Sequence, residues 1–217
     1  MSKKAVIFDL DGVIVDTAKF HFLAWKDLAN KIGINFTEKE NEQLKGVSRV
    51  KSLEKILDWG NKKISAEEFQ TLMDEKNENY LKYVDQLTQA DILPGVKKRL
   101  QQLKENNHPI ALGSASKNAK RILNQMQLTH FFDAIVDGNE VTKAKPDPEV
   151  FLKAASLLQV LPENAIVFED AVAGIQAANQ AQMLSVGIGD KSTLQEANFV
   201  FADFTEISDQ MFNQLMN

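Results

Sequence analysis

Two aspartates, Asp9 and Asp11, follow an apolar run near the start of the chain. Side chains i and i+2 of an extended segment point the same way, so both carboxylates could face one site. Gly12 follows and would let the backbone turn close to that site. Two like charges this close are costly unless a cation or a shared proton compensates them, and a divalent metal ion is the less costly solution.

Phosphoryl transfer would use each part of this arrangement. One carboxylate can attack phosphorus to form an aspartyl phosphate, and the other can carry a proton to or from the second oxygen. A hard cation can neutralise the charge on the phosphate. An exposed Asp-x-Asp turn, with Asp16 or Thr17 capping the next helix, is the alternative that this stretch alone leaves open.

Later in the chain, the apolar run 109–113 ends at Ser114, where a helix begins. A strand-to-helix turn has free backbone N–H groups, and with the serine hydroxyl it could bind a phosphate. Ser116, Lys117 and Asn118 could extend this phosphate site. They could equally form the cap and first turn of the helix.

The apolar run 165–168 ends in two more carboxylates, Glu169 and Asp170. Together with Asp9 they would place three acidic side chains at one edge of a parallel sheet, a donor set suited to Mg²⁺ that keeps some water ligands. Capping of the next helix is the simpler explanation of Asp170 when it is taken alone.

A basic residue, Lys145, lies in a proline-containing loop after the apolar run 132–136. The residue before a proline favours extended backbone, so Lys145 and Pro146 should be extended and the lysine should lie in the crevice. There it would balance negative charge on Asp9 and on phosphoryl oxygens. A solvated loop lysine is the common alternative, and Lys143 is the less suitable candidate.

Short apolar strands followed by helices must position these groups. The predicted strands are 5–8, 109–113, 132–136, 165–168, 183–187 and 199–201, and a closing helix is predicted over 204–216. Short strands that are apolar throughout are typical of parallel sheets buried on both faces. Because such strands end at one edge of the sheet, we expect the polar groups to meet in one crevice.

The stretch from 37 to about 87 has helical periodicity throughout, and a capping box of Thr37 and Glu40 begins its first helix. We therefore predict an α/β fold, with a Rossmann-like parallel sheet core covered by helices on both faces and an inserted all-helical cap domain. The predicted core comprises residues 1–16 and 88–217, and the predicted cap comprises residues 17–87.

The composition limits the kind of partner. The chain has 217 residues, a net charge of −5, a pI of about 5.3 and no dense stripe of Lys and Arg. This argues against nucleic acid or a membrane surface as the main partner and favours a small substrate. The absence of cysteine excludes disulfides and thiolate catalysis. With no long apolar run or signal-like start, we expect a cytoplasmic, monomeric enzyme.

The sequence Phe8-Asp9-Leu10-Asp11-Gly12-Val13 resembles the first motif of the haloacid dehalogenase superfamily. The resemblance implies that Asp9 is the nucleophile and Asp11 the general acid/base. It also implies a Mg²⁺ ion bound by the Asp9 carboxylate, by the backbone carbonyl of Asp11 and by Asp170. Glu169 would bind this ion directly or through water.

Two further segments resemble motifs of that superfamily. The resemblance assigns Ser114 and the backbone amide of Ala115 to the transferring phosphoryl group. The sequence Lys-Pro-x-Pro at 145–148 resembles the third motif, which gives Lys145 its charge-balancing role.

The segment Leu44-Lys45-Gly46-Val47-Ser48-Arg49, followed by Ser52, resembles the cap signature of the β-phosphoglucomutase family. The resemblance implies that Arg49 holds the phosphate distal to the nucleophile, helped by Ser116, Lys117 and Asn118. The sugar pocket would be lined by His21, Trp25, Gly46, Val47, Ser48, Ser52 and Lys76. The residues alone favour packing for the histidine and tryptophan, and a solvated helix face for the lysine.

This resemblance implies interconversion of β-D-glucose 1-phosphate and D-glucose 6-phosphate, through an aspartyl phosphate and β-glucose 1,6-bisphosphate. A Mg²⁺-dependent phosphatase acting on a sugar phosphate or another small phosphoester would use the same catalytic groups and is the alternative. The cap loop 46–52 and Lys117-Asn118 suit a second phosphate and favour the mutase. A non-catalytic phosphate-binding module would not need both Asp9 and Asp11.

Overall fold

Six parallel strands form one sheet in the computed structural model, which describes residues 3–44 and 47–216. The strand order is β3-β2-β1-β4-β5-β6, which confirms the predicted α/β class. The strands are β1 (Ala5–Phe8), β2 (Ile110–Gly113), β3 (Ala134–Val136), β4 (Ala165–Glu169), β5 (Leu184–Ile188) and β6 (Phe199–Phe201).

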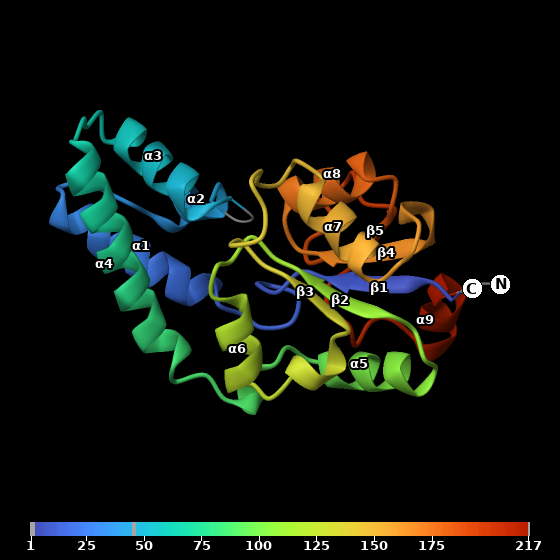
Figure 1. Ribbon diagram of the computed structural model, residues 1–217. Helices are drawn as coiled ribbons and strands as arrows, with labels where there is room; N and C mark the ends of the chain where they lie inside the picture. The colour runs from blue at the N-terminus through green and yellow to red at the C-terminus, as the bar shows by residue number, and fades with distance from the viewer. Residues whose placement is uncertain (1–2, 45–46, 217) are drawn as a thin grey trace.

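Helices cover both faces of the sheet (Figure 1). They are α5 (Val96–Glu105), α6 (Ala119–Gln125), α7 (Glu149–Leu157), α8 (Val172–Gln180) and α9 (Asp209–Met216). Strand β1 is central and wholly buried, with Val6 and Phe8 in the core under α5, α6 and α9 and Ile7 in the core under α7 and α8. Burial of alternate side chains in two separate cores explains why this short strand is apolar at every position.

The closing helix begins later than the sequence analysis predicted. Residues 204–206 form a turn in which the Asp203 carboxylate accepts the Thr205 N–H, at 2.6 Å. The hydroxyl of Ser208 then accepts the Met211 N–H at 3.1 Å and caps α9. Two short polar side chains therefore form a turn and a helix cap in what was expected to be one continuous helix.

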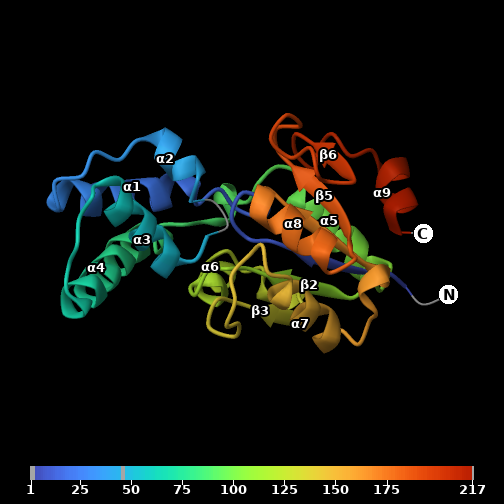
Figure 2. The same cartoon turned by 90° about the horizontal axis from the view of Figure 1, so that it is seen from above.

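Four helices between β1 and β2 form the cap region, α1 (Ala18–Lys31), α2 (Glu38–Glu42), α3 (Arg49–Trp59) and α4 (Ala66–Val84). They enclose a hydrophobic core of their own, in which Trp25, Phe36 and Leu53 are buried. The predicted capping box of Thr37 and Glu40 is present at the start of α2. The cap region lies beyond the carboxyl ends of the strands (Figures 1 and 2).

The two segments that connect the cap region to the sheet run side by side. Val15 forms an antiparallel bridge with Ile92, and the Leu93 N–H donates to the Ile14 carbonyl at 2.9 Å. The two connecting segments are therefore held together close to Asp11, which itself bridges to Val15. Within the described part of the chain, no helix has the length and apolar character needed to cross a membrane.

Candidate active site

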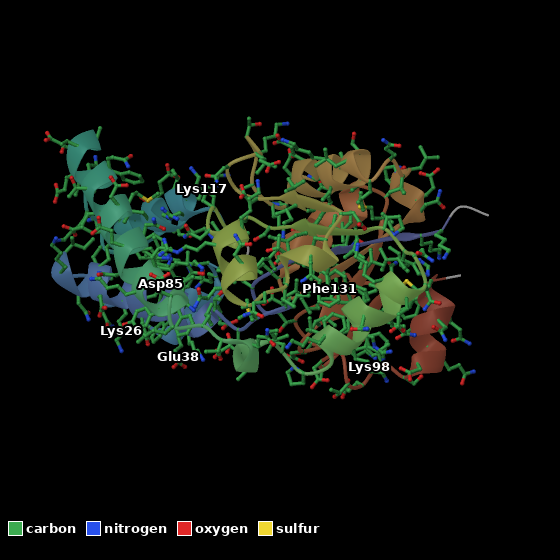
Figure 3. All side chains as sticks on the ribbon, turned by 60° about the horizontal axis from the view of Figure 1, so that its bottom comes forward. Lys26, Glu38, Asp85, Lys98, Lys117 and Phe131 are labelled. Atoms are coloured by element: carbon green, nitrogen blue, oxygen red, sulfur yellow. The ribbon has the colours of Figure 1, made fainter. Side chains whose placement is uncertain are left out.

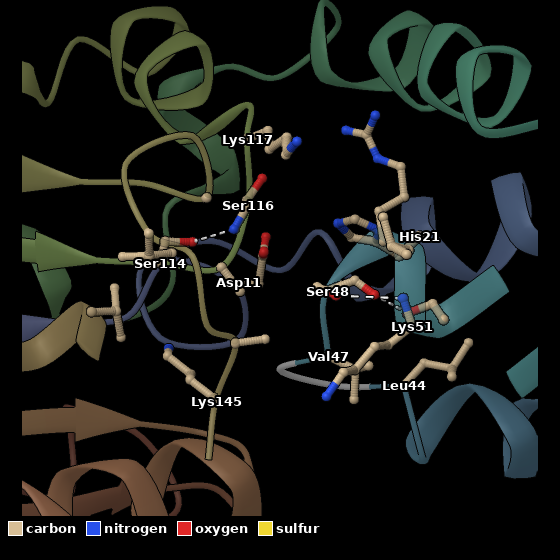
Figure 4. A pocket seen from close by; sticks show the side chains of 18 of the residues that line it. Asp11, His21, Leu44, Val47, Ser48, Lys51, Ser114, Ser116, Lys117 and Lys145 are labelled. Atoms are coloured by element: carbon tan, nitrogen blue, oxygen red, sulfur yellow. Dashed lines mark hydrogen bonds between the residues drawn. The ribbon is translucent and has the colours of Figure 1, made fainter. Parts of the chain in front are cut away.

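A cavity of about 910 Å³ lies between the strand ends and the cap region (Figure 4). It brings together groups that the sequence predicted from both regions. The predicted residues that line it are Asp9, Asp11, His21, Trp25, Val47, Ser48, Arg49, Ser52, Lys76, Ser114, Ala115, Ser116, Lys117, Asn118, Lys145 and Asp170. Gly46 lies outside the described residues. Glu169 is fully buried and is not among the lining residues.

The Lys145 ammonium lies at the centre of the buried charges below the cavity. Its Nζ is 2.6 Å from Asp9 Oδ1 and 2.8 Å from Glu169 Oε2, and it donates to the Gly113 carbonyl at 3.2 Å. Burial lowers the pKa of Lys145, but the two carboxylates more than offset this effect and leave the pKa above its usual value. The lysine therefore stays protonated and anchors Asp9.

Glu169 shares this ammonium with Asp9 and accepts the Ala171 N–H at 3.1 Å. Burial and the nearby charge of Asp9 raise the pKa of Glu169 to about 7, although Lys145 opposes the shift. The Lys145 ammonium thus faces the carboxylates of both Asp9 and Glu169. These three side chains together carry a negative charge that a further cation would balance.

Asp9, Glu169 and Asp170 have carboxylate oxygens within 4.8 Å of one another. Such a set of hard oxygen donors fits a divalent cation of the magnesium type. Gly12, at φ +76°, allows the approach of Asp170, because a Cβ at this position would collide with the Asp170 carboxylate. The absence of a side chain at Gly12 therefore helps to build this candidate metal site.

Asp11 lies in the same cavity and accepts a hydrogen bond from the Thr17 hydroxyl. Burial and then the charge of Asp9 raise the pKa of Asp11 to about 7, against the lowering effect of Thr17. Both protonation states are therefore accessible near neutral pH, as a general acid/base requires. The sequence suggests Thr17 only as a helix cap, but Thr17 makes no side-chain capping bond, while Asp16 accepts the Ala18 N–H.

The loop after β2 is held in shape by its own hydroxyl groups. Ser114 Oγ accepts the Ser116 N–H at 3.1 Å, and Ser116 Oγ accepts the Asn118 N–H at 3.2 Å. Asn139, which the sequence analysis missed, supports the loop by donating to the Lys117 carbonyl at 3.0 Å. Because each serine oxygen accepts a bond, its hydroxyl proton can be donated to an anion in the cavity.

The loop that carries Lys145 differs from the prediction. Lys145 and Pro146 lie inside a turn closed by the Asp147 N–H and the Ala144 carbonyl at 3.0 Å, and the peptide bond between them is cis. The expectation of extended backbone was wrong. The loop folds back on the Glu149 carboxylate, which accepts the Thr142 N–H at 3.0 Å, and Lys145 nevertheless lines the cavity.

On the cap side, the Lys76 amine is buried rather than solvated. Its Nζ is 2.8 Å from His21 Nδ1 and lies 4.7 Å and 4.6 Å from the ring centroids of Trp25 and Tyr80. Burial, then the charge of Arg49, hold the pKa of Lys76 well below its usual value, although Asp11 opposes this. Tyr80, which the sequence analysis missed, packs against His21 with ring centroids 4.2 Å apart.

The site combines an aspartate pair, a lysine and further carboxylates at the carboxyl edge of a parallel sheet, and a helical insertion covers it. This combination defines a class of phosphate-processing α/β proteins. The chain belongs to the family of haloacid dehalogenase-like hydrolases, whose model matches residues 6–188. This confirms the resemblance of the first motif.

Particular members of that family are similar over nearly the whole chain. The β-phosphoglucomutase of Bacillus subtilis is 45% identical over 213 residues, which cover 97% of this chain and 94% of that protein. A crystal structure of β-phosphoglucomutase from Clostridium difficile has a TM-score of 0.94 and 46% identity, and covers 98% of this chain and 96% of its own. A phosphorylated carbohydrates phosphatase of Thermotoga maritima is 31% identical over 204 residues, with 91% and 92% coverage.

Proposed function

We propose that this chain is a β-phosphoglucomutase, which interconverts β-D-glucose 1-phosphate and D-glucose 6-phosphate. The observation that carries this proposal is that one cavity contains two sets of groups suited to binding phosphate. Ser114, Asp9, Asp11 and Lys145 line it at the strand ends, with the Lys145 Nζ 2.6 Å from Asp9 Oδ1. Lys117 lies in another part of the cavity (Figure 4), and Arg49 lines the cavity from helix α3 of the cap region. The 45% identity to the Bacillus subtilis enzyme agrees with this substrate and product.

In the first half-reaction, an Asp9 carboxylate oxygen attacks phosphorus of the bisphosphate. The bond between phosphorus and the sugar oxygen breaks, and protonated Asp11 gives its proton to the leaving oxygen. In the second half-reaction, Asp11 removes the proton from a hydroxyl of glucose 1-phosphate or glucose 6-phosphate. That hydroxyl then attacks the aspartyl phosphate and restores the Asp9 carboxylate.

Lys145 holds Asp9 in position and balances the charge on the phosphoryl oxygens, with Ser114 and the Ala115 N–H as further donors. We assign Mg²⁺ to the candidate metal site. It would be held by Asp9, Glu169 and Asp170, and the family resemblance adds the backbone carbonyl of Asp11. When bound, this ion supplies positive charge that neutralises the phosphate.

The other predicted residues bind the rest of the bisphosphate. Arg49, with Ser116, Lys117 and Asn118, would hold the phosphate that is not being transferred, since a guanidinium presents paired donors to phosphate oxygens. The sugar would contact the cap-side residues His21, Trp25, Gly46, Val47, Ser48, Ser52 and Lys76. We place the borders of the cap domain at residues 17 and 87.

The cap must exclude water for this reaction to be a mutase. Hydrolysis of the aspartyl phosphate would make the same groups a phosphatase, the activity for which the Thermotoga maritima relative is named. A phosphatase acting on a small phosphoester is therefore the second candidate function. The two functions differ in whether a sugar hydroxyl or water attacks the aspartyl phosphate.

Phosphorus NMR separates the two candidates in one experiment. The protein is incubated with Mg²⁺, β-glucose 1-phosphate and a trace of glucose 1,6-bisphosphate, and glucose 6-phosphate and inorganic phosphate are followed together. A mutase yields glucose 6-phosphate with little free phosphate. Free phosphate as the main product would overturn the mutase assignment, and the Asp9→Asn variant should show neither product.

A further inference from the structure

The segment that leads from the cap region back to the sheet lies on helix α6. Asp85 follows α4 directly, and its carboxylate receives three bonds from the Arg121 guanidinium, one from Nε at 3.0 Å and two from Nη2 at 2.6 and 2.7 Å. One turn further along α6, Gln125 Nε2 donates to the carbonyls of Asp85 and Leu87 at 3.2 and 3.1 Å. Positions 121 and 125 share one face of a helix, so this face of α6 binds the returning segment.

Helix α6 also contacts the cap region at its other end. The Asn118 side chain, which directly precedes α6, donates to the Asn77 side chain of α4 at 2.9 Å. Figure 1 shows α6 beside the lower part of α4, and Figure 3 shows Asp85 on the cap side of the molecule. The last part of α4 together with the segment that follows it, residues 77–87, is therefore attached to α6 and the residue before it at two separated points.

An exposed ion pair contributes little to stability, and the side chains of Arg121 and Asp85 are 51% and 50% exposed. The importance of this pair lies instead in its position, at the junction between the cap region and helix α6. The Arg121 Nη2 bonds both oxygens of Asp85 and Nε adds a bond to Oδ1, so the contact restricts orientation as well as distance. Because Asp85 lies where the cap region ends, a change in this contact would tilt α4 relative to the phosphate-binding loop that precedes α6.

We propose that Arg121 is a positioning residue, which sets the orientation of the cap over the cavity through Asp85. This inference rests on the proposed function in one respect, that a correctly oriented cap keeps water from the aspartyl phosphate at Asp9. Neither Arg121 nor Asp85 lines the cavity. Their effect on the reaction is therefore carried entirely by the orientation of α4 and the residues attached to it.

The first test compares how the aspartyl phosphate is partitioned between sugar and water. In Arg121→Ala and Asp85→Asn we expect the ratio of inorganic phosphate to glucose 6-phosphate to rise by about two- to five-fold, the range expected for loss of one ion pair. The double variant should give the same ratio as either single variant, because both act through one contact. Lys104→Ala, which removes the ion pair with Asp133 inside the sheet domain, should leave the ratio unchanged.

An unchanged ratio in both single variants, additive effects in the double variant, or an equal change in Lys104→Ala would each overturn the proposal. A purely structural role would lower stability and total activity without changing the partition. Both products come from the same folded molecules, so the amount of folded protein cancels in the ratio and partial unfolding of a variant does not imitate the expected result.

The second test does not depend on the reaction. Since the chain has no cysteine, Glu67→Cys on α4 and Glu163→Cys in the sheet domain allow two spin labels to be attached at known positions. Arg121→Ala should broaden or shift the distance distribution between the labels, and Lys104→Ala should not. An unchanged distance distribution overturns the positioning role. If the distribution shifts but the protein releases only inorganic phosphate from glucose 1-phosphate, the positioning role stands and only the proposed mutase function is wrong.

Discussion

At the residue scale, the site depends on side chains whose charges are set by their neighbours. Lys145 is protonated because Asp9 and Glu169 lie at 2.6 and 2.8 Å, although its own burial opposes the charge. Asp11 has a pKa of about 7 because it is buried beside Asp9. The two aspartates therefore have different surroundings, as the proposed roles of nucleophile for Asp9 and proton carrier for Asp11 require.

Arg49→Ala tests the assignment of the distal phosphate. Loss of a charge-assisted hydrogen bond costs about 1.5–3 kcal/mol, so turnover of the bisphosphate should fall by about 10- to 100-fold. Hydrolysis of a small aryl phosphate, which has no second phosphate, should change by less than about two-fold. Equal losses for both compounds would mean that Arg49 does not bind the distal phosphate, and Lys55→Ala on the same helix serves as the control.

Lys76→Met tests the cost of burying an amine in the cap region. Burial and Arg49 lower the pKa of Lys76 in the folded protein. At a pH between this lowered pKa and 10.5, Lys76 is therefore protonated in the unfolded chain and largely neutral in the folded protein, so the unfolded chain binds more protons. The free energy of unfolding should therefore rise with pH over this range.

In Lys76→Met this rise should be smaller, and stability at pH 7 should increase by about 1–2 kcal/mol after the lost cation–π contacts are subtracted. Urea unfolding measured from pH 7 to 10 checks both expectations, with the exposed Lys63→Met as the matched control. A decrease in stability at pH 7, or an unaltered slope with pH, would contradict the explanation.

At the element scale, close approach of backbones at the strand ends brings the charged groups together. Asp170 and Ala171 connect β4 to helix α8, and at Gly174 this helix lies against the Glu169 side chain, where a Cβ would collide with the carboxylate. At Gly12 the chain passes the Asp170 carboxylate in the same way. Both glycines therefore allow the carboxyl edge of the sheet to hold several acidic groups in a small volume.

Gly174→Ala tests this packing against helix propensity. Alanine favours a helix over glycine by about 1 kcal/mol, but the added methyl group overpacks a buried site at a cost of about 1–3 kcal/mol. We expect a net loss of stability of up to about 2 kcal/mol, together with reduced kcat because Glu169 no longer holds Lys145 in place.

Gly60→Ala is the matched control for this variant. Its methyl group would crowd Ile34 in the cap region, far from Glu169, and should lower stability while each folded molecule keeps its activity. A stabilised Gly174→Ala protein with full activity would show that the contact with Glu169 does not constrain this position.

At the scale of the whole molecule, the cavity lies between the sheet with its covering helices and the cap region. The sheet has a core on each face, and α1 to α4 enclose another, in which Trp25 and Leu53 are buried. The lower part of α4 packs into the sheet core through Tyr80 and Val84. The cap region is thus attached along one edge of the molecule, and the candidate phosphate-binding groups of both regions line the remaining space.

Magnesium should stabilise the whole fold, because the carboxylates around Lys145 carry uncompensated negative charge. At a concentration about 100-fold above the dissociation constant, the ion adds about 2.7 kcal/mol, which corresponds to a rise in Tm of about 5–10 °C for a chain of this size. Thermal unfolding with Mg²⁺ and with a chelator measures this difference. The rise should be much smaller in Asp170→Asn, and equal rises in both proteins would place the bound ion elsewhere.

Local pattern along the chain was sufficient for the strands and for the residues at their ends. The four apolar residues before Asp9 form β1 with the predicted bounds, and Asp11, Ser114, Lys145 and Asp170 line one cavity. Parallel strands of one sheet share a carboxyl edge, so a polar residue that follows such a strand is placed by the strand itself. The fold class and the candidate catalytic groups could therefore be predicted from composition, spacing and resemblance.

Only the tertiary structure determined which charges are buried and what they contact. Lys76 is 55 residues from His21 in the chain, and its burial depends on the packing of α4 against α1. Likewise, Thr17 bonds Asp11 instead of capping a helix, and Glu169 lies behind Lys145 instead of lining the cavity. The physical reason is that periodicity is local in the sequence, whereas burial, pKa and the partner of each polar atom depend on groups that folding brings from distant segments.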